Sequence, residues 1–176
     1  MKKPEIISLL TENHNRFIQP FESMNENQFL ASANDKWNSS QQLDHIIRAV
    51  SPVVLAFSLP SFIPRLMFGK ANRPSKTFEA LVEKYHAKLA AGGQASGQFI
   101  PKNLTFVDRD AAIQKLKSLV QKLNKHIAGK SEEALDTFIL PHPLLGKLTF
   151  REMLYFTAYH AEHHRKNTER NLQGIV

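Results

Sequence analysis

Apolar residues recur at intervals of three and four along most of the chain, which is the pattern of amphipathic helices. The first such segment runs from about Pro4 to near Ser23, and Pro20 predicts a kink or an early end. Its apolar positions are Ile6, Ile7, Leu9, Leu10, Phe17, Ile18 and Phe21. Residues 24–38 follow as a predicted loop, which contains the only tryptophan, Trp37.

A second helix is predicted to begin at Ser39, which can cap it because Gln42 stands three residues later in the capping-box position. It continues towards Phe57, with an irregularity expected at Pro52. The stretch "LPSFIPRLMFGK" then predicts a short helical or irregular connector that ends at Gly69.

Two further periodic segments occupy the middle of the chain. One runs from about Ser75 to Ala91 and is stopped by two glycines. The stretch "GGQASGQFIPKN" after it predicts a long loop outside the core. The other segment begins at Asp108, a strong N-cap residue, and carries apolar residues at helical spacing: Ala112, Ile113, Leu116, Leu119, Val120 and Leu123.

The stretch "LPHPLLGKL" predicts a loop, after which Thr149 caps a last helix from Phe150 to about Leu172. Strand patterns are nearly absent, and no repeat of 20 to 50 residues occurs. The chain therefore predicts an all-α fold of one domain, residues 1–176. We expect an antiparallel four-helix bundle with a long connector and short extra helical segments.

The composition restricts the possible chemistry. Cysteine is absent, which excludes a disulfide framework, a thiolate zinc site and a cysteine nucleophile. Any metal must therefore be bound by nitrogen and oxygen. The start of the chain does not have the pattern of a signal peptide, and no window approaches the ~20 apolar residues of a membrane span. We expect a soluble, cytoplasmic protein with no membrane partner.

Lysine and arginine outnumber aspartate and glutamate by 23 to 16, for a formal net charge of +7. A nucleic-acid partner has to be considered for such a chain. The basic residues are scattered, however, and form no block of five or six, which is usual for a solvated surface. We predict no nucleic-acid partner.

Three of the eight histidines lie in the stretch "YHAEHHRKN", residues 159–167. At about 100° per residue, His160 and His164 point side by side, towards or along the apolar stripe of the last helix. Glu162 lies about 200° round the helix from His160 and cannot serve an ion held by this pair. The zincin arrangement of a protease is therefore excluded. What remains is a two-histidine clamp that needs a third ligand from another helix.

His45 is a candidate for that third ligand, although it lies well off the centre of the apolar face of its helix. The periodicity alone does not favour it. The other histidines are set among polar or loop residues and are not expected to be ligands: His14, His86, His126 and His142.

Two separated stretches resemble one known family. "KWNSSQQLDHIIRAV", followed over a hundred residues later by "PHPLLGKLTFREMLYFTAYHAEHHRKN", is similar to the DinB-like superfamily of damage-inducible, metal-dependent four-helix bundles. Members typically have a tryptophan and small polar residues before a helix with one histidine, then "G-x-L-T-x-x-E-x-L" leading into H-x-x-x-H. The resemblance extends over essentially the whole chain.

The resemblance implies that His45, His160 and His164 bind one divalent metal ion, with zinc, nickel and iron(II) all suited to imidazole ligands. Metal-binding histidines need an acceptor on the second ring nitrogen. Asn167 and His163 are the expected outer groups of the site, and Asp44, Glu12 and Asn13 are further candidates. His163 is not expected to be a fourth ligand.

Family members with known roles include thiol-dependent transferases and isomerases, and others are assigned as metal-dependent hydrolases. The resemblance therefore implies a metal-dependent enzyme that activates a thiol or water, with a low-molecular-weight thiol cosubstrate and a small electrophile as partners. The alternative is a non-catalytic metal- or ligand-binding protein of the stress response. Homodimers are common in the family, and the apolar segment "SPVVLAFSLPSFIPRLMF" predicts an interface.

Overall fold

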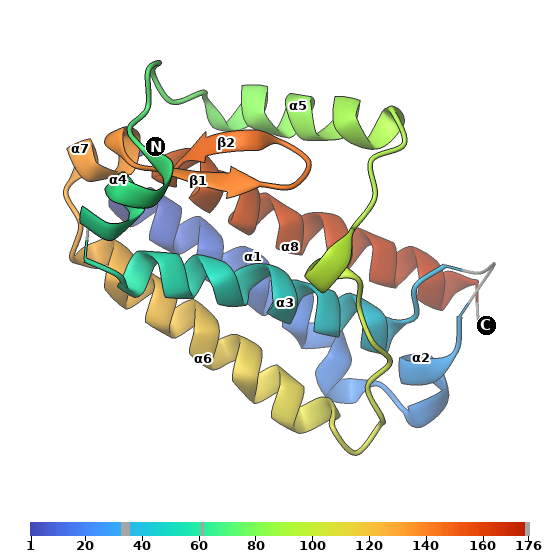
Figure 1. Cartoon of the computed structure of the whole chain (residues 1–176). Coiled ribbons are helices and arrows are strands. Elements are labelled where there is room, and N and C mark those ends of the chain that lie inside the picture. Colours follow the sequence, from blue (N-terminus) through green and yellow to red (C-terminus); the bar gives the residue numbers. More distant parts are fainter. Residues whose placement is uncertain (33–35, 61, 175–176) are drawn as a thin grey trace.

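Four long helices pack side by side in the computed structural model, which describes residues 1–32, 36–60 and 62–174. They are α1 (Lys3–Ser23), α3 (Ser39–Ser58), α6 (Arg109–Ala128) and α8 (Phe150–Gln173). Helices α1 and α8 run in one direction and α3 and α6 in the other (Figure 1). The predicted all-α four-helix bundle is confirmed.

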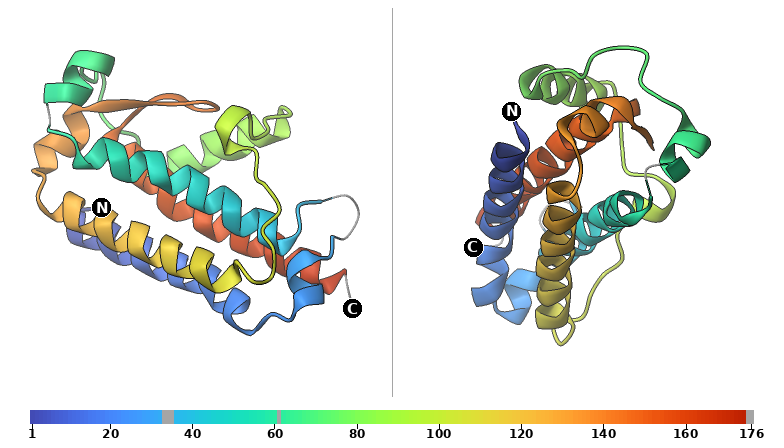
Figure 2. Two further views of the ribbon diagram at one scale, coloured as in Figure 1. Left: turned by 60° about the horizontal axis from the view of Figure 1, so that its bottom comes forward. Right: turned by 90° about the vertical axis from the view of Figure 1, so that its left-hand side faces the viewer.

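The end-on view in Figure 2 shows these helices around one core. Aromatic rings fill much of it: Phe17 lies 5.0 Å from Phe21, and Phe57 lies 4.4 Å from Phe150, measured between ring centroids. All four rings are fully buried, and each contributes roughly 1.5–3 kcal/mol through the removal of apolar surface from water. The apolar residues at helical spacing are thus buried between the helices, as the pattern predicted.

The helix starts are fixed by polar side chains. Thr149 caps α8 as predicted, because its hydroxyl accepts a hydrogen bond from the Glu152 amide. The Glu152 carboxylate also accepts one from the Thr149 amide, which completes a capping box. The prediction for α3 was wrong by one residue, because the cap is Asn38 and its partner is Gln41. The Ser39 hydroxyl instead donates to the Gln28 carbonyl, 3.0 Å away.

Proline interrupts neither of the helices in which irregularities were predicted, since α1 continues past Pro20 and α3 past Pro52. The prediction for α6 needs a correction as well. Asp108 stands at the N-cap position, but its carboxylate accepts from the amide and hydroxyl of Thr105 and does not cap the helix.

Several short elements depart from the predicted loops. The segment 24–38 contains the short helix α2 (Glu26–Leu30), which Asn25 caps, and α7 (Glu132–Thr137) was not predicted. The third predicted helix is α5 (Phe78–Ala90), which begins three residues late because Thr77 is its cap. Ser75 is engaged elsewhere, since its hydroxyl donates to Asp136 at 2.6 Å.

The predicted loop "LPHPLLGKL" is largely an antiparallel hairpin, β1 (Ile139–His142) and β2 (Gly146–Thr149). His142 shapes its turn, because its Nδ1 accepts from the amides of Leu144 and Leu145. The prediction of a loop failed here because four-residue strands that contain proline and glycine carry almost no alternating pattern.

The connector after α3 forms the short helix α4 (Phe62–Phe68), and Gly69 follows with a φ of 86°. Three apolar side chains of α4 and one at the end of α3 are strongly exposed: Leu55 (64%), Phe62 (67%), Leu66 (86%) and Met67 (63%). We call these four residues the apolar patch. Within the described residues, no single helix is long and apolar enough to cross a membrane, and only α3 with α4, bent by 115°, meets those criteria as a pair.

The loop "GGQASGQFIPKN" contributes no residue to the core cluster, as predicted, and contains one turn of 3-10 helix, η1 (Gly97–Phe99). It is nevertheless fastened to α3 (Figure 1). Asp44 accepts from the Lys102 amide at 2.7 Å, and Arg48 donates to the Gln98 carbonyl at 3.2 Å. We call residues 97–104 the anchored loop, since the Leu104 amide also donates to α3, at Ser40.

Candidate metal centre

Three histidines from two helices converge at one place in the bundle. His45 comes from α3, and His160 and His164 lie one turn apart on α8, so the i, i+4 spacing puts both rings on the same side. The Nε2 atom of His160 lies 3.2 Å from that of His45 and 2.9 Å from that of His164. All three side chains are buried, and their ligand atoms lie within 4.8 Å of one another.

The outer nitrogens show where the protons lie. The Nδ1 atom of His45 donates to the Phe99 carbonyl oxygen at 2.7 Å, because a carbonyl can only accept. The Nδ1 atom of His164 faces the Oε1 atom of Gln42, whose amide nitrogen donates to the Trp37 carbonyl at 3.3 Å. Both rings are therefore protonated at Nδ1, and in the neutral rings each Nε2 presents a lone pair to the centre of the cluster.

One cation can coordinate all of these lone pairs, whereas hydrogen bonds within the cluster cannot satisfy all of them. The Nε2 atom of His160 carries one hydrogen at most and faces two acceptors, so the metal-free cluster leaves one close nitrogen–nitrogen contact poorly bonded. Ligands at 2.0–2.1 Å from a tetrahedral ion lie about 3.3 Å apart, close to the separations seen here. The residues present fit a divalent ion.

Burial keeps the cluster neutral. It lowers the pKa of His160 and His164 well below the ordinary value, and the nearby histidines act in the same direction. Burial also lowers the pKa of His45, against the opposing effect of its hydrogen bond to Phe99. Only neutral imidazole can coordinate a metal, so the cluster is already in the form that binding requires.

The two residues predicted to support the cluster contact each other. The amide nitrogen of Asn167 lies 3.1 Å from the Nε2 atom of His163, and Arg170 donates to the Asn167 side-chain oxygen at 2.6 Å. The ring of His163 packs against that of His164 with centroids 5.1 Å apart. Burial lowers the pKa of His163 to about 4.

The acceptors that the structure gives to the outer nitrogens are Gln42 and the Phe99 carbonyl, and neither was predicted. Gln42 could have been found, because it lies three residues before His45 on the same face of α3. The further candidates have other roles. Asp44 binds Arg48 and the anchored loop, Asn13 donates to the Ala158 carbonyl, and Glu12 pairs with Arg16.

The other histidines lie outside the cluster. His14 was predicted to sit among polar residues, but it is 1% exposed, and its Nδ1 donates to the Leu10 carbonyl at 2.8 Å. Burial lowers its pKa to about 4. His86 is exposed and bonds the Tyr159 hydroxyl, and His142 belongs to the hairpin turn.

A cleft of about 660 Å³ opens over the histidine cluster, and His45 and His164 form part of its lining. Trp37 stacks on the His164 ring at an interplanar angle of 15° with centroids 6.1 Å apart. Tyr85 lies on α5, with its ring perpendicular to that of His160. The described lining of the cleft is mainly polar, and Trp37, Leu89 and Ile100 supply its larger apolar side chains.

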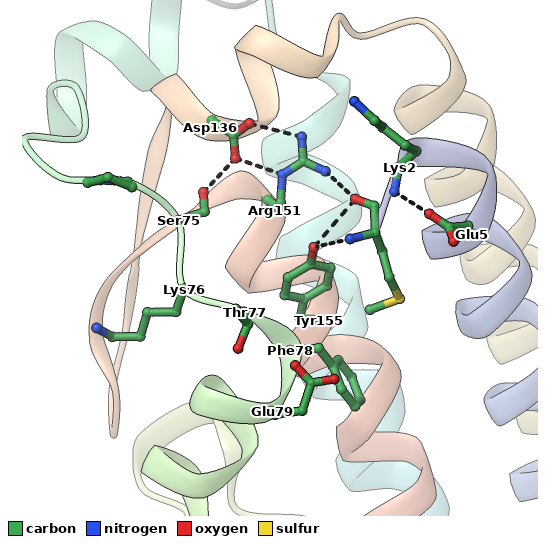
Figure 3. A pocket seen from close by; sticks show the side chains of 12 residues that line it. Lys2, Glu5, Ser75, Lys76, Thr77, Phe78, Glu79, Asp136, Arg151 and Tyr155 are labelled. Atoms are coloured by element: carbon green, nitrogen blue, oxygen red, sulfur yellow. Dashed lines mark hydrogen bonds and ion pairs between the residues drawn. The ribbon is translucent and has the colours of Figure 1, made fainter.

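A larger cavity of about 900 Å³ lies at the opposite end of α8 and contains no histidine among its lining residues (Figure 3). Several of its polar groups bind one another: Arg151 binds Asp136 and the Met1 carbonyl, and Ser75 donates to Asp136. The smaller cleft is the better candidate site, because its histidines present unmatched lone pairs.

Comparison with known proteins agrees with the family resemblance of the sequence. The sequence model of the DinB superfamily matches residues 9–166, a span that includes all three histidines of the cluster. No curated protein and no solved structure matches the chain. The helical bundle, the three converging histidines and this match over most of its length agree, and the chain belongs to the DinB superfamily.

Proposed function

We propose that this chain is a metal-dependent enzyme in which His45, His160 and His164 hold one divalent ion and present it to a ligand in the cleft. The observation that carries the proposal is the convergence of three Nε2 atoms, two of them fixed as lone pairs by their outer hydrogen bonds. A divalent ion with such ligands would lower the pKa of a bound thiol or water and so supply a nucleophile near neutral pH.

The residues around the cluster would keep the site rigid and partly dry. Gln42 and the Phe99 carbonyl hold the rings of His164 and His45 in one tautomer, so neither ring has to turn when a ligand binds. Trp37 and Tyr85 cover neighbouring faces of the histidine rings. Both arrangements favour an ordered site of fixed geometry over a flexible metal store.

Transfer of a small thiol to an electrophile is the reaction that we favour. The chain has no cysteine, so a sulfur nucleophile would have to arrive as a cosubstrate. A cleft of about 660 Å³ has room for a low-molecular-weight thiol beside a small electrophile. Hydrolysis would use the same site with water in place of the thiol.

The alternative is a non-catalytic metal- or ligand-binding protein of the stress response. It uses the same three histidines and differs in one measurable way, since no thiol or water nucleophile would be consumed. Steady-state assays of the metal-loaded protein with thiols and with epoxide or chlorinated electrophiles separate the two functions. Product formation that His160→Ala abolishes supports the enzyme, and stoichiometric binding without turnover supports the alternative.

The metal site is tested first, by elemental analysis of the purified protein and of four variants. His45→Ala, His160→Ala and His164→Ala should each lose most of the bound metal, because a site left with two ligands loses much of its binding energy. His163→Ala is the matched control, since it removes the same side chain next to His164 and should retain the metal. Equal loss in His163→Ala and His164→Ala would contradict the proposed ligand set.

A further inference from the structure

Among the described residues, the charged groups that line the cleft over the histidine cluster are all positive. Lys36 and Arg170 line it, and none of its described lining residues is acidic. The nearest carboxylates on α8 are engaged outside the lining, because Arg165 pairs with both Glu162 and Glu169. A divalent ion on three neutral imidazoles would add positive charge at the base of the same cleft, because none of these three side chains is an anion.

Arg170 belongs to a short chain of polar contacts along one face of α8. It donates to the Asn167 side-chain oxygen at 2.6 Å, and Asn167 in turn contacts His163, which also lines the cleft. The Nε atom of Arg170 is directed to the Lys166 carbonyl at 3.3 Å. A guanidinium has five N–H donors, so these contacts position Arg170 and leave donors for an acceptor from outside.

Part of the lining is apolar. Trp37, Leu89 and Ile100 come from three separate segments and line the same cleft as the two cations. A short apolar body in the ligand would match these side chains. It also carries a negative group that Lys36 and Arg170 can reach.

We propose, on the basis of the proposed function, that the cleft selects a small thiol that carries a carboxylate. The sulfur would lie at the histidine cluster, and the carboxylate would lie at Lys36 and Arg170. A neutral thiol of the same size would keep the interaction of its sulfur with the histidine cluster but would lack the ion pairs with Lys36 and Arg170. The two cations therefore determine which thiol the site accepts.

Isothermal titration calorimetry of the zinc-loaded protein with 3-mercaptopropionate and with 3-mercaptopropionamide tests this directly. The two thiols differ in one charge, so their difference in affinity, corrected for the ionisation of each thiol, reports the carboxylate. We expect the acid to bind about five- to twentyfold more tightly at low salt, since each partly exposed ion pair supplies about two- to fivefold. Added salt should reduce the preference.

Three variants assign the preference to residues. Lys36→Gln and Arg170→Gln should each lower it by about two- to fivefold while the affinity for the amide stays the same. Lys166→Gln is the matched control, because it removes an exposed positive charge from the same helix but outside the lining, and the preference should not change.

The outcomes distinguish this inference from the proposed function. A protein that takes up no zinc contradicts the metal site itself. A zinc-loaded protein that binds neither compound contradicts the thiol cosubstrate, and the inference fails with it. Equal affinity for the two compounds overturns the inference alone, and a preference that survives in both Lys36→Gln and Arg170→Gln overturns the assigned residues.

Discussion

Gln42 lies outside the histidine cluster but contacts it directly. It is buried, and its side-chain oxygen faces the Nδ1 atom of His164 while its amide nitrogen donates to the Trp37 carbonyl. The side chain therefore links a ring of the cluster to the wall of the cleft. Its removal would leave the His164 ring free to turn and to change tautomer.

Gln42→Ala should weaken metal affinity about 10- to 100-fold, the usual effect of losing a group that orients a metal-binding histidine. Competition with a chromogenic chelator measures this affinity. Gln41→Ala is the control, because Gln41 caps α3 and does not reach the cluster. We expect Gln41→Ala to lower stability by about 1 kcal/mol with metal affinity unchanged. Equal affinities for the two variants would show that Gln42 does not orient the site.

His14 predicts a pH dependence of stability that is independent of the metal. Its folded-state pKa is about 4, below the ordinary value of 6.5, so between these values the unfolded chain binds more protons than the folded one. Stability should therefore fall as the pH falls from about 6.5 to about 4, and His14 accounts for up to about 3 kcal/mol of the loss.

Chemical denaturation in the presence of a chelator measures this dependence. His14→Leu should leave a shallower dependence in the same pH window, because it removes the buried titrating group. It also removes a buried Nε2 atom that has no hydrogen-bond partner in the structure. An unchanged slope in His14→Leu would show that His14 is not the group responsible.

The histidine pair on α8 was predictable as a candidate because two histidines one turn apart leave a clear periodic signal. His45 was harder to predict, because apolar periodicity identifies only the centre of the apolar face of a helix. The histidine cluster lies instead among buried polar residues such as Ser40 and Gln42. The family resemblance supplied this residue. The Phe99 carbonyl was not predictable at all, because every residue has a backbone carbonyl and the loop geometry selects one.

At the scale of elements, Glu152 joins the start of α8 to the chain segment before α5. Its side chain is fully buried and accepts from Arg73, from the Lys76 amide at 2.8 Å and from the Thr149 amide at 2.9 Å. Burial alone would raise the pKa of Glu152, but these hydrogen bonds together lower it. A depressed pKa of a carboxyl group means that its contribution to stability is lost as the pH falls through the folded-state pKa.

Glu152→Ala should lower the free energy of unfolding by about 3–5 kcal/mol, because it leaves the guanidinium and two amides without their acceptor. Urea denaturation measures the effect. Glu133→Ala removes an exposed carboxylate from the nearby α7 and should change stability by less than about 0.5 kcal/mol. A similar small effect for Glu152→Ala would mean that water replaces the lost acceptor.

The long helices were predictable and the short elements were not, for a physical reason. Helices of about 20 residues carry several turns of apolar spacing, whereas α2 and α7 have five and six residues and depend on their caps and packing. The hairpin is similar, since His142 and the neighbouring helices determine its turn. Such short elements depend on tertiary contacts, which cannot be predicted from the local sequence pattern.

At the scale of the whole molecule, the apolar patch on α3 and α4 predicts self-association. Leu66 is 86% exposed, and Phe62, Met67 and Leu55 add further exposed apolar surface on the same two consecutive helices. Clusters of exposed apolar side chains of this kind mark interaction sites more often than isolated ones do. We expect the occupant to be a second copy of this chain.

Sedimentation velocity should show a dimer for the unmodified protein and a monomer for Leu66→Lys. Val107→Lys is the control, because Val107 is 91% exposed in the turn before α6 and lies outside the apolar patch. It should leave the dimer intact. A monomeric profile of the unmodified protein at micromolar concentration, or a dimer that persists in Leu66→Lys, would contradict this prediction.

The ligands of the proposed site are far apart in the chain, since His45 and His160 are separated by 115 positions. During synthesis His45 leaves the ribosome long before α8 exists, so the ion can be enclosed only after the last helix has docked. Metal acquisition would therefore follow assembly of the bundle. The rate of refolding should not depend on the ion, whereas unfolding should slow when it is present, because an ion bound only by the assembled bundle would stabilise the folded state and not the transition state. Cells short of the metal would then accumulate a folded, empty protein that can be filled later.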